Sequence, residues 1–409
     1  MAGPLPDGEP APSDGALPER VELGQRPFGV YLHVPFCVTR CGYCDFNTYT
    51  AAELGSDPGA SPSTWADAVE AELVLARRVL GGRQGPARTV FIGGGTPSLL
   101  EPDDLLRALD AVHDLLGLAP DAEVTMEANP ESVSGPALER LRSGGVNRLS
   151  LGMQSASPHV LAVLDRVHSP GRVAQAVAQA RDAGIDNLSL DLIYGSPGES
   201  LEDWQHTLDV ALGMQPEHVS AYALIVEQGT RLAARIGRGE IPPPVDDLMA
   251  AMYETADDAF AAAGLDWYEV SSWARSPDRR SRHNWLYWTD GDWWGVGPGA
   301  HSHVAGVRWW NVKHPAAWAQ RLAGGLSPAA AREVLDEPTR RLERVMLGLR
   351  TVAGAALEDV RAAVGEQADA HAQTLLADGL LDPDALARGR AVLTRRGRLL
   401  ADAVTHRLT

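Results

Sequence analysis

The sequence predicts an α/β protein in which a partial (β/α)6 barrel precedes a small helical domain. Three observations predict it. Six short apolar runs recur along the chain, segments with helical periodicity separate them, and this alternation ends near residue 240. Strands that alternate with helices form a parallel sheet, because each crossover helix returns the chain to the same edge.

The predicted strands are short and evenly distributed. They fall at residues 29–34, 89–92, 123–127, 148–152, 187–192 and 218–224. The helical pattern between them is clearest at residues 65–80 and 102–116, where apolar side chains recur every three to four positions. Six such units in series predict a curved, TIM-like sheet with its functional site at the carboxyl ends of the strands.

Changes in composition divide the chain into four parts. Residues 1–26 are rich in Pro, Gly and acidic residues and are predicted to be a disordered tail. The barrel is assigned to residues 27–240. An extension at 241–335 begins with Ile-Pro-Pro-Pro, continues with a helix at 246–263, and contains every tryptophan except Trp65 and Trp204.

Residues 336–409 are predicted to form a helical, winged-helix-like domain. Leu342, Val345, Met346 and Leu349 recur at helical spacing and form one apolar stripe. A hairpin is expected close to the end of the chain.

The overall charge excludes some partners. Asp and Glu number 54 against 36 Lys and Arg, a formal net charge of -18, which lacks the basic surface of a general nucleic-acid binder. No run of about 18 apolar residues predicts a membrane span, and the first residues lack a signal-peptide pattern. A cytoplasmic protein with small-molecule or protein partners is expected, and peripheral contact with a membrane stays open.

All three cysteines of the chain lie close together, at Cys37, Cys41 and Cys44. A cubane 4Fe-4S cluster has four irons, and each takes one outside ligand, usually a thiolate. Three thiolates therefore leave one iron open for a bound molecule. On the triplet alone, a structural zinc site completed by His33 remains an alternative, whereas three thiols pair poorly as disulfides.

A glycine-rich turn, Gly93-Gly94-Gly95-Thr96-Pro97, directly follows the second predicted strand. Glycines let a ligand approach the backbone closely and leave amide groups free to bind it. The same residues also suit an ordinary strand-to-helix turn. The motif alone does not decide between the two.

The segment from Tyr31 to Cys44, together with Gly-Gly-Gly-Thr-Pro, resembles the radical S-adenosylmethionine (SAM) superfamily. The resemblance implies a radical SAM barrel in which the amino and carboxylate groups of SAM chelate the open iron. It also implies that an electron from the reduced cluster cleaves the sulfonium bond and releases methionine and a 5'-deoxyadenosyl radical. An electron donor is then a required partner.

Within that superfamily, residues 27–405 resemble the oxygen-independent coproporphyrinogen III oxidase group. The resemblance implies that SAM is held by Tyr31, Tyr43, Gly94, Gly95, Thr96, Glu127, Gln154, Arg166 and Asp191. These side chains suit the ligand, because an arginine can fork onto a carboxylate and a Glu or Asp can accept from an ammonium or from ribose hydroxyls. Each one alone would also suit an ordinary barrel residue.

One departure narrows the resemblance. True coproporphyrinogen dehydrogenases carry a further cysteine two residues after the third ligand, where this chain has Phe46. Cys44-Asp45-Phe46-Asn47 is instead similar to the HemW-type haem chaperones, which implies a cluster, SAM, haem and a haem-accepting partner such as a membrane respiratory enzyme. Decarboxylation of coproporphyrinogen III, or another radical SAM reaction, remains the alternative, so enzyme activity is left open.

A second motif, His283-Asn284-Trp285-Leu286-Tyr287-Trp288, fits the HNxxYW pattern associated with haem binding in those chaperones. It implies His283 as a haem ligand, with Tyr287 a weaker candidate. An imidazole is a common axial ligand, and tryptophans can stack on a porphyrin or simply pack a domain seam. His301 and His303 are alternative ligands, and the turn from Gly295 to Gly299 is expected to line the cavity.

Overall fold

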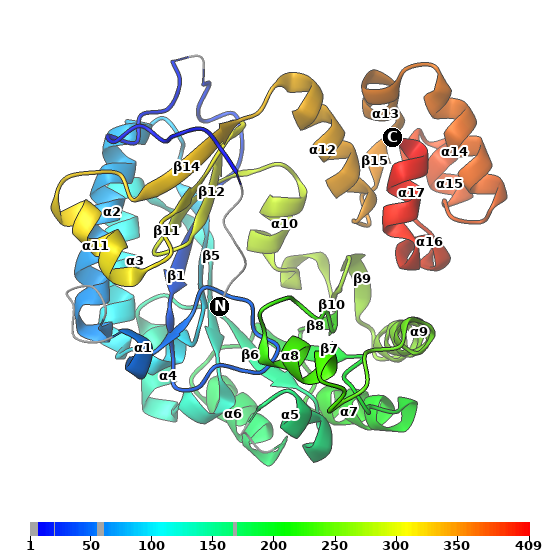
Figure 1. Ribbon diagram of the computed structural model, residues 1–409, viewed down its shortest axis with the longest axis horizontal. Helices are drawn as coiled ribbons and strands as arrows, with labels where there is room; N and C mark the ends of the chain where they lie inside the picture. The colour runs from blue at the N-terminus through cyan, green and yellow to red at the C-terminus, as the bar shows by residue number, and fades with distance from the viewer. Residues whose placement is uncertain (1–6, 20, 55–60, 167–169) are drawn as a thin grey trace.

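The computed structural model describes residues 7–19, 21–54, 61–166 and 170–409 (Figure 1). Its core is a single sheet, which has twelve strands in this part of the chain. The central strands are β1 (Phe28–Val34), β4 (Ala87–Gly94), β5 (Leu118–Ala128), β6 (Arg148–Gln154), β7 (Leu188–Tyr194) and β8 (His218–Ala223). Every neighbouring pair among them is parallel. The predicted partial (β/α)6 barrel is therefore confirmed.

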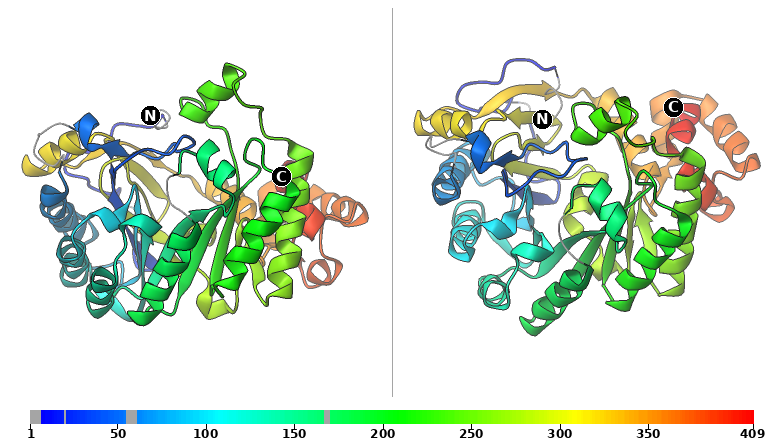
Figure 2. Two further views of the ribbon diagram at one scale, coloured as in Figure 1. Left: turned by 90° about the horizontal axis from the view of Figure 1, so that it is seen from below. Right: turned by 60° about the horizontal axis from the view of Figure 1, so that its bottom comes forward.

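Helices cover the outer face of this sheet (Figure 2). They are α2 (Pro62–Leu80), α3 (Pro102–Leu116), α4 (Gly135–Ser143), α6 (Pro170–Asp182) and α7 (Leu201–Gly213). Two short helices, α5 (Pro158–Val163) and α8 (Arg231–Gly237), pack instead in a separate cluster with Ile193 and Leu224 near the carboxyl ends of β7 and β8. Shorter elements are β2 (Phe36–Cys37), β3 (Tyr49–Thr50), α1 (Ala51–Leu54) and the 3-10 turns η1 (Pro97–Leu99), η2 (Pro130–Ser132) and η3 (Pro277–Arg279).

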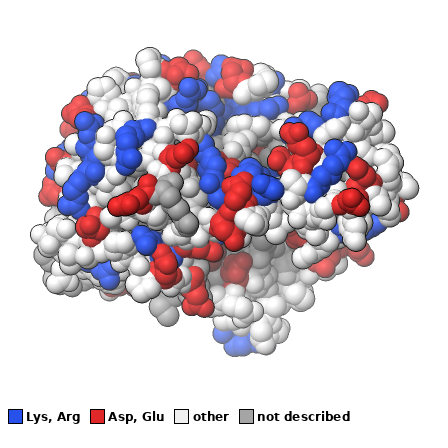
Figure 3. Space-filling view, turned by 90° about the horizontal axis from the view of Figure 1, so that it is seen from above, with Lys and Arg blue, Asp and Glu red and all other residues white. Residues whose placement is uncertain are grey.

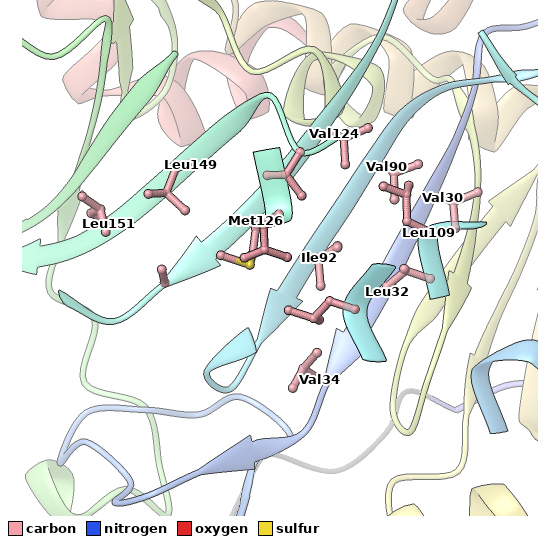
Figure 4. Close-up of a cluster of buried hydrophobic side chains, with 14 of the residues drawn as sticks. Val30, Leu32, Val34, Val90, Ile92, Leu109, Val124, Met126, Leu149 and Leu151 are labelled. Atoms are coloured by element: carbon pink, nitrogen blue, oxygen red, sulfur yellow. The ribbon is translucent and has the colours of Figure 1, made fainter. Parts of the chain in front are cut away.

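Alternate side chains of the central strands form the core between sheet and helices. Figure 4 shows Leu32 of β1, Ile92 of β4 and Leu149 of β6 in this layer, together with Leu109 of α3. All four are at most 3% exposed. Because neighbouring side chains on a strand point to opposite faces, the residues between these positions face the barrel interior, where the polar groups of the site lie.

The aromatic-rich extension adds strands to both edges of the barrel sheet. Beyond β1 come β11 (Asp292–Val296), β12 (His301–Val304), β13 (Val307–Asn311) and β14 (Ala329–Val334), and beyond β8 come β10 (Ser272–Ala274) and β9 (Asp266–Glu269). Only β11 continues the parallel pairing. The helices of this region are α9 (Asp246–Ala262), α10 (Arg282–Trp288) and α11 (Pro315–Ala323).

The N-terminal segment differs from the predicted disordered tail from residue 7 onwards. Glu9 forms a β-bridge and an ion pair of 2.7 Å with Arg332 of the edge strand β14, and the Ser327 amide donates to the Ser13 carbonyl at 2.7 Å. An edge strand offers unpaired backbone groups to any segment that reaches it. Composition measures only the intrinsic tendency of the tail and therefore missed this contact.

The C-terminal helices have a hydrophobic core of their own, which includes Val345, Leu375 and Val404. They are α12 (Glu337–Leu349), α13 (Leu357–Val364), α14 (Gln367–Ala377), α15 (Pro383–Ala387), α16 (Arg395–Leu399) and α17 (Ala401–Leu408). The expected terminal hairpin is wrong, because Thr394 caps α16 and the chain then stays helical to Leu408. The two strands present, β15 (Ala355–Ala356) and β16 (Arg390–Ala391), pair farther upstream.

An ion cluster ties α12 to the barrel. Asp290, just before β11, lies 3.2 Å from Arg26, 3.5 Å from Arg340 and 3.8 Å from Arg344. Figure 3 views the molecule from the side of α12, and acidic and basic side chains are interspersed on this face. No helix within the described ranges is long and apolar enough to cross a bilayer.

Candidate cluster and cofactor site

The three cysteines lie on one loop at the carboxyl end of β1. Cys37, Cys41 and Cys44 are partly exposed and line a cavity of about 420 Å³. The Thr96 hydroxyl donates to Cys37 Sγ at 3.8 Å, and Arg166 Nη1 donates to Cys41 Sγ at 3.5 Å. Burial raises the pKa of the Cys37 thiol and raises that of Cys44 to about 11. Metal coordination is what would keep such thiols as thiolates.

His33 does not fit the zinc alternative. Its Nδ1 lies 2.9 Å from the Tyr31 hydroxyl and its Nε2 lies 2.9 Å from the Asn47 carbonyl oxygen, so both ring nitrogens are engaged. Within the described ranges, no three His, Cys, Asp or Glu side chains converge on one ion position. A cubane does not need that convergence, because each thiolate binds a different iron.

The cavity continues from the cysteines to the strand ends. All the residues matched to SAM contacts line it except Tyr31, namely Tyr43, Gly94, Gly95, Thr96, Glu127, Gln154, Arg166 and Asp191. Tyr31 lies deeper in the barrel, where its ring packs against Phe91 at a centroid distance of 6.2 Å. The predicted SAM-contacting residues thus lie together around one cavity, except Tyr31, which lies beneath it.

The glycine turn after β4 meets Glu127 at the end of β5. The Gly94 amide donates to Glu127 Oε2 at 2.9 Å, and Gly94 has a φ of 114°. A Cβ on Gly93 would lie 2.8 Å from the same carboxylate, and one on Gly95 would lie 2.5 Å from the Phe36 carbonyl oxygen. Only glycines fit this turn, because a Cβ would strike the chain packed against it.

Two partly buried carboxylates, Glu127 and Asp191, face the cavity. Burial raises the pKa of Glu127 to about 7, and the nearby charge of Asp191 adds to the rise. Asp191 accepts hydrogen bonds from the Ser150 hydroxyl at 3.0 and 2.9 Å, which oppose the rise in its own pKa caused by burial. Such acceptors suit an ammonium or ribose hydroxyls.

Arg166 and Gln154 complete the wall of the cavity, with Arg166 beside Cys41. Arg166 Nη2 donates to the Gly152 carbonyl at 2.7 Å, while its buried Nε has no partner within the described residues. Gln154 has a φ of 63°, an uncommon conformation for a side chain of its size, and the register shifts between Gly152 and Gln154. A donor without a partner and a wall of acceptors fit a ligand that carries both a carboxylate and an ammonium.

Sequence reasoning missed Ser150 and Tyr222, which also line the cavity. Ser150 lies opposite Glu127 in the sheet register and holds Asp191. Tyr222 comes near the end of β8 and is 42% exposed. The strand-end rule that placed the site would have found Tyr222, since it lies near the carboxyl end of the sixth central strand.

The turn from Gly295 to Gly299 does not line the cavity, contrary to expectation. It supports the cysteine loop from behind, because Asn47 Nδ2 donates to the carbonyl oxygens of Pro298 and Lys313, both at 2.9 Å. A Cβ on Gly297 would lie 2.8 Å from the His33 carbonyl oxygen. The glycines are needed for close packing of two loops.

The HNWLYW segment forms α10, and its buried His283 lies beside Thr89 near the start of β4. The cysteines lie at the opposite end of the strands. His283 Nδ1 is 2.8 Å from the Thr89 hydroxyl, and Nε2 is 2.7 Å from the Tyr287 hydroxyl. Burial lowers the pKa of His283 to about 3. His303 is also buried, with Nδ1 2.9 Å from the Gly291 carbonyl oxygen, whereas His301 is exposed.

An open barrel with three cysteines and a polar cavity at its strand ends defines a protein of the radical SAM class. The model of the Radical SAM superfamily matches residues 31–211. The solved structure of the coproporphyrinogen III oxidase HemN from Escherichia coli superposes with a TM-score of 0.79 at 23% identity, covering 95% of this chain and 91% of that one. This likeness supports the fold.

Curated relatives give the family. The Heme chaperone HemW of Mycobacterium tuberculosis is 52% identical over 392 residues, which cover 96% of this chain and 97% of that protein. The Heme chaperone HemW of Bacillus subtilis is 33% identical over 379 residues, which cover 91% and 97%. The chain belongs to the HemW family.

Proposed function

We propose that this chain is a haem chaperone. It binds a 4Fe-4S cluster through Cys37, Cys41 and Cys44, SAM in the adjoining cavity, and haem, which it transfers to an acceptor protein. Support comes from the HemW relatives that match nearly the whole chain. The cavity fits the two cofactors, since its wall combines three thiols, a glycine turn, two partly buried carboxylates and an arginine.

The observation that carries the proposal is Phe46 on the wall of this cavity. Its side chain is 55% exposed beside the cluster ligands. By the resemblance, a coproporphyrinogen dehydrogenase has a cysteine here. An exposed phenyl ring offers apolar contact and no thiol chemistry, which favours binding and transfer over decarboxylation.

SAM bound to a reduced cluster would supply radical chemistry. Because the residues of the SAM cavity are all present, an enzymatic function is a second candidate. That function is oxidative decarboxylation of coproporphyrinogen III or another radical SAM reaction. An anaerobic assay with coproporphyrinogen III, SAM and a reductant separates the two. The chaperone proposal predicts no decarboxylated product, and product formed at a catalytic rate would favour the enzyme.

His283 is proposed as the haem ligand, with Tyr287 beside it. Binding of iron at His283 Nε2 requires that Nε2 leaves the Tyr287 hydroxyl and that α10 moves away from the barrel floor. The neutral imidazole that burial maintains is the form that binds iron. The proposal therefore includes an opening of α10 on haem loading.

The partners in this proposal are a haem-accepting protein, such as a membrane respiratory enzyme, and an electron donor for the cluster. We place the chain in the cytoplasm, where thiols stay reduced.

A haem titration of the cluster-reconstituted chain tests the function. We expect a saturable Soret shift at about one haem per chain, weakened in His283→Ala because the axial ligand is lost. His301→Ala is the matched control, because His301 is an exposed histidine on β12. If only His301→Ala lost the Soret shift, the haem ligand would be His301 rather than His283. No saturable shift in the wild type would refute the chaperone.

A further inference from the structure

Arg148 is a fully enclosed cation in the middle of the barrel. Its side chain is only 2% exposed. Within the described residues its guanidinium takes part in none of the ion pairs, and the buried Nε has no hydrogen-bond partner. A guanidinium cannot lose its proton in a protein, and a buried charge is costly unless opposite charges compensate it. Arg148 is therefore a buried positive charge that no ion pair within the described residues neutralises.

The register places Arg148 one step below the cavity. It lies opposite Thr125 on β5, and two residues later Ser150 lies opposite Glu127. Residues two apart on a strand share a face, so Arg148 points into the barrel beneath Ser150, which holds Asp191. The charge of Arg148 lowers the pKa of both Glu127 and Asp191, against the larger effect of burial.

Two buried carboxylates that share one site repel each other, and one of them normally takes up a proton. A protonated acid is a poorer acceptor for an ammonium or a hydroxyl. SAM carries a sulfonium and an ammonium, so its site needs both carboxylates ionised. A fixed cation below the two carboxylates favours their ionised form and leaves the cavity free for the ligand.

We propose that Arg148 is a positioning residue of the SAM site, a buried cation that holds Glu127 and Asp191 as carboxylates facing the ligand. It acts through these two side chains and does not line the cavity. The inference rests on the SAM site proposed above and is independent of haem binding.

The pH dependence involves every titratable group that faces these carboxylates. Beside burial, Asp191 of β7 raises the pKa of Glu127 and Arg148 of β6 lowers it. The charge of Glu127 in turn raises the pKa of Tyr31 of β1, Tyr222 of β8 and Tyr287 of α10. Tyr31 and Tyr287 keep their protons, because burial raises the pKa of each. Burial lowers the pKa of His218 and of His283, and the charge of Arg148 lowers both further, so that the two rings stay neutral. Near pH 7 Glu127 therefore titrates, as does Glu269, whose pKa burial also raises to about 7 and whose charge acts on Tyr222.

The test is SAM binding by equilibrium dialysis, from pH 6 to pH 9, with the cluster-reconstituted chain under anaerobic conditions. The wild type should lose affinity below about pH 7, where Glu127 takes up a proton. In Arg148→Met the midpoint of this profile should move up by about one unit, which is about a fivefold loss of ionised Glu127 at pH 7. Arg148→Lys keeps the charge, and its midpoint should stay near that of the wild type.

Arg181→Met is the matched control, because Arg181 pairs with Glu217 on the outside of the barrel and should leave the profile unchanged. A merely structural role for Arg148 would lower SAM affinity equally at every pH, and that outcome would overturn the proposal, as would an unmoved midpoint. If Arg148→Met does not fold, Arg148→Lys decides, because a midpoint raised by about one unit there would exclude an effect of charge. A wild type that binds no SAM would refute the site itself rather than the role of Arg148.

Discussion

At the scale of single residues, the bonds of His283 explain why the HNWLYW motif fits two functions. The ring is held by Thr89 and Tyr287, and it packs on Phe91 with a centroid distance of 5.2 Å. These contacts are those of a core histidine. The spacing of four residues between His283 and Tyr287 within α10 brings the hydroxyl to Nε2, so the motif is explained structurally before any ligand is considered.

Tyr287→Phe tests that bond. Removing the hydroxyl leaves a buried ring nitrogen without its partner, and we expect the free energy of unfolding to fall by about 1 kcal/mol. Urea denaturation of Tyr287→Phe, His283→Ala and the double variant gives the coupling between the two residues. Additive losses would show that the contact contributes nothing to stability.

At the scale of elements, the glycine turn after β4 joins two strands to the cofactor site. Gly95→Ala should reduce SAM binding by tenfold or more, because the added Cβ would lie 2.5 Å from the Phe36 carbonyl oxygen and push the turn away from the cysteine loop. Iron content and SAM binding measure the effect. Gly135→Ala, where a Cβ meets nothing within 4 Å, is the control and should bind SAM like the wild type.

Glu72 on α2 connects this helix to the turn behind the cysteine loop. Its carboxylate accepts hydrogen bonds from the Gly297 amide at 2.9 Å, from Asn311 Nδ2 at 2.7 Å and from Trp318 Nε1 at 2.7 Å. Glu72→Gln turns an amide group toward these donors, so the free energy of unfolding should fall by about 2 kcal/mol. Glu70→Gln on the same helix, where the side chain is 51% exposed, should change little.

Glu72 makes the stability of the folded chain fall as pH rises. Burial raises the pKa of its carboxyl to about 7 in the folded chain, from 4.5. The folded state therefore binds the proton more tightly, and stability falls as pH rises from about 4.5 to about 7. Thermal unfolding across this window should show a smaller slope in Glu72→Gln. An unchanged slope would mean that the hydrogen-bond donors keep Glu72 ionised.

The sequence predicts the central elements well and the edges of the sheet poorly. Glu127 and Gln154 lie at the ends of β5 and β6 and Asp191 lies in the middle of β7, and the strand-end rule for parallel sheets brings the first two together without any long-range information. The pairing of β1 with β11 joins Phe28 to Asp292, and no local pattern specifies so distant a partner. Trp294 and Trp309 pack against each other in the strands added there, so these tryptophans fill a seam.

At the scale of the whole molecule, the C-terminal domain is joined to the barrel by a forked ion pair. Arg398 donates to both oxygens of Asp257 on α9, at 3.0 and 2.9 Å, and its guanidinium lies 4.5 Å from the Trp267 ring. Trp273 Nε1 donates to the same carboxylate at 2.9 Å. Asp257 is thus one of the carboxylates that join the domain to the barrel, along with Asp290, which pairs with Arg340 of α12.

Asp257→Asn should loosen the seam without affecting the cluster. The neutral amide cannot take both branches of the fork, so hydrogen exchange in α16 and α17 should speed up by roughly tenfold, in line with a loss of about 1–2 kcal/mol. Iron content should stay unchanged. Asp258→Asn is the control, because Asp258 is 68% exposed and pairs with Arg395 at the surface. Equal exchange in both variants would assign the seam to apolar packing.

Because β1 pairs with β11, which is far along the chain, the sheet can be completed only late in synthesis. A ribosome adds about 5–20 residues per second, so the cysteine loop leaves it on the order of ten seconds or more before β11 is complete. During that interval β1 has an unpaired edge on the side where β11 will bind. Because the turn from Gly295 to Gly299 contacts the cysteine loop through Asn47 and lies at the end of β11, we expect stable cluster binding only after the sheet is complete.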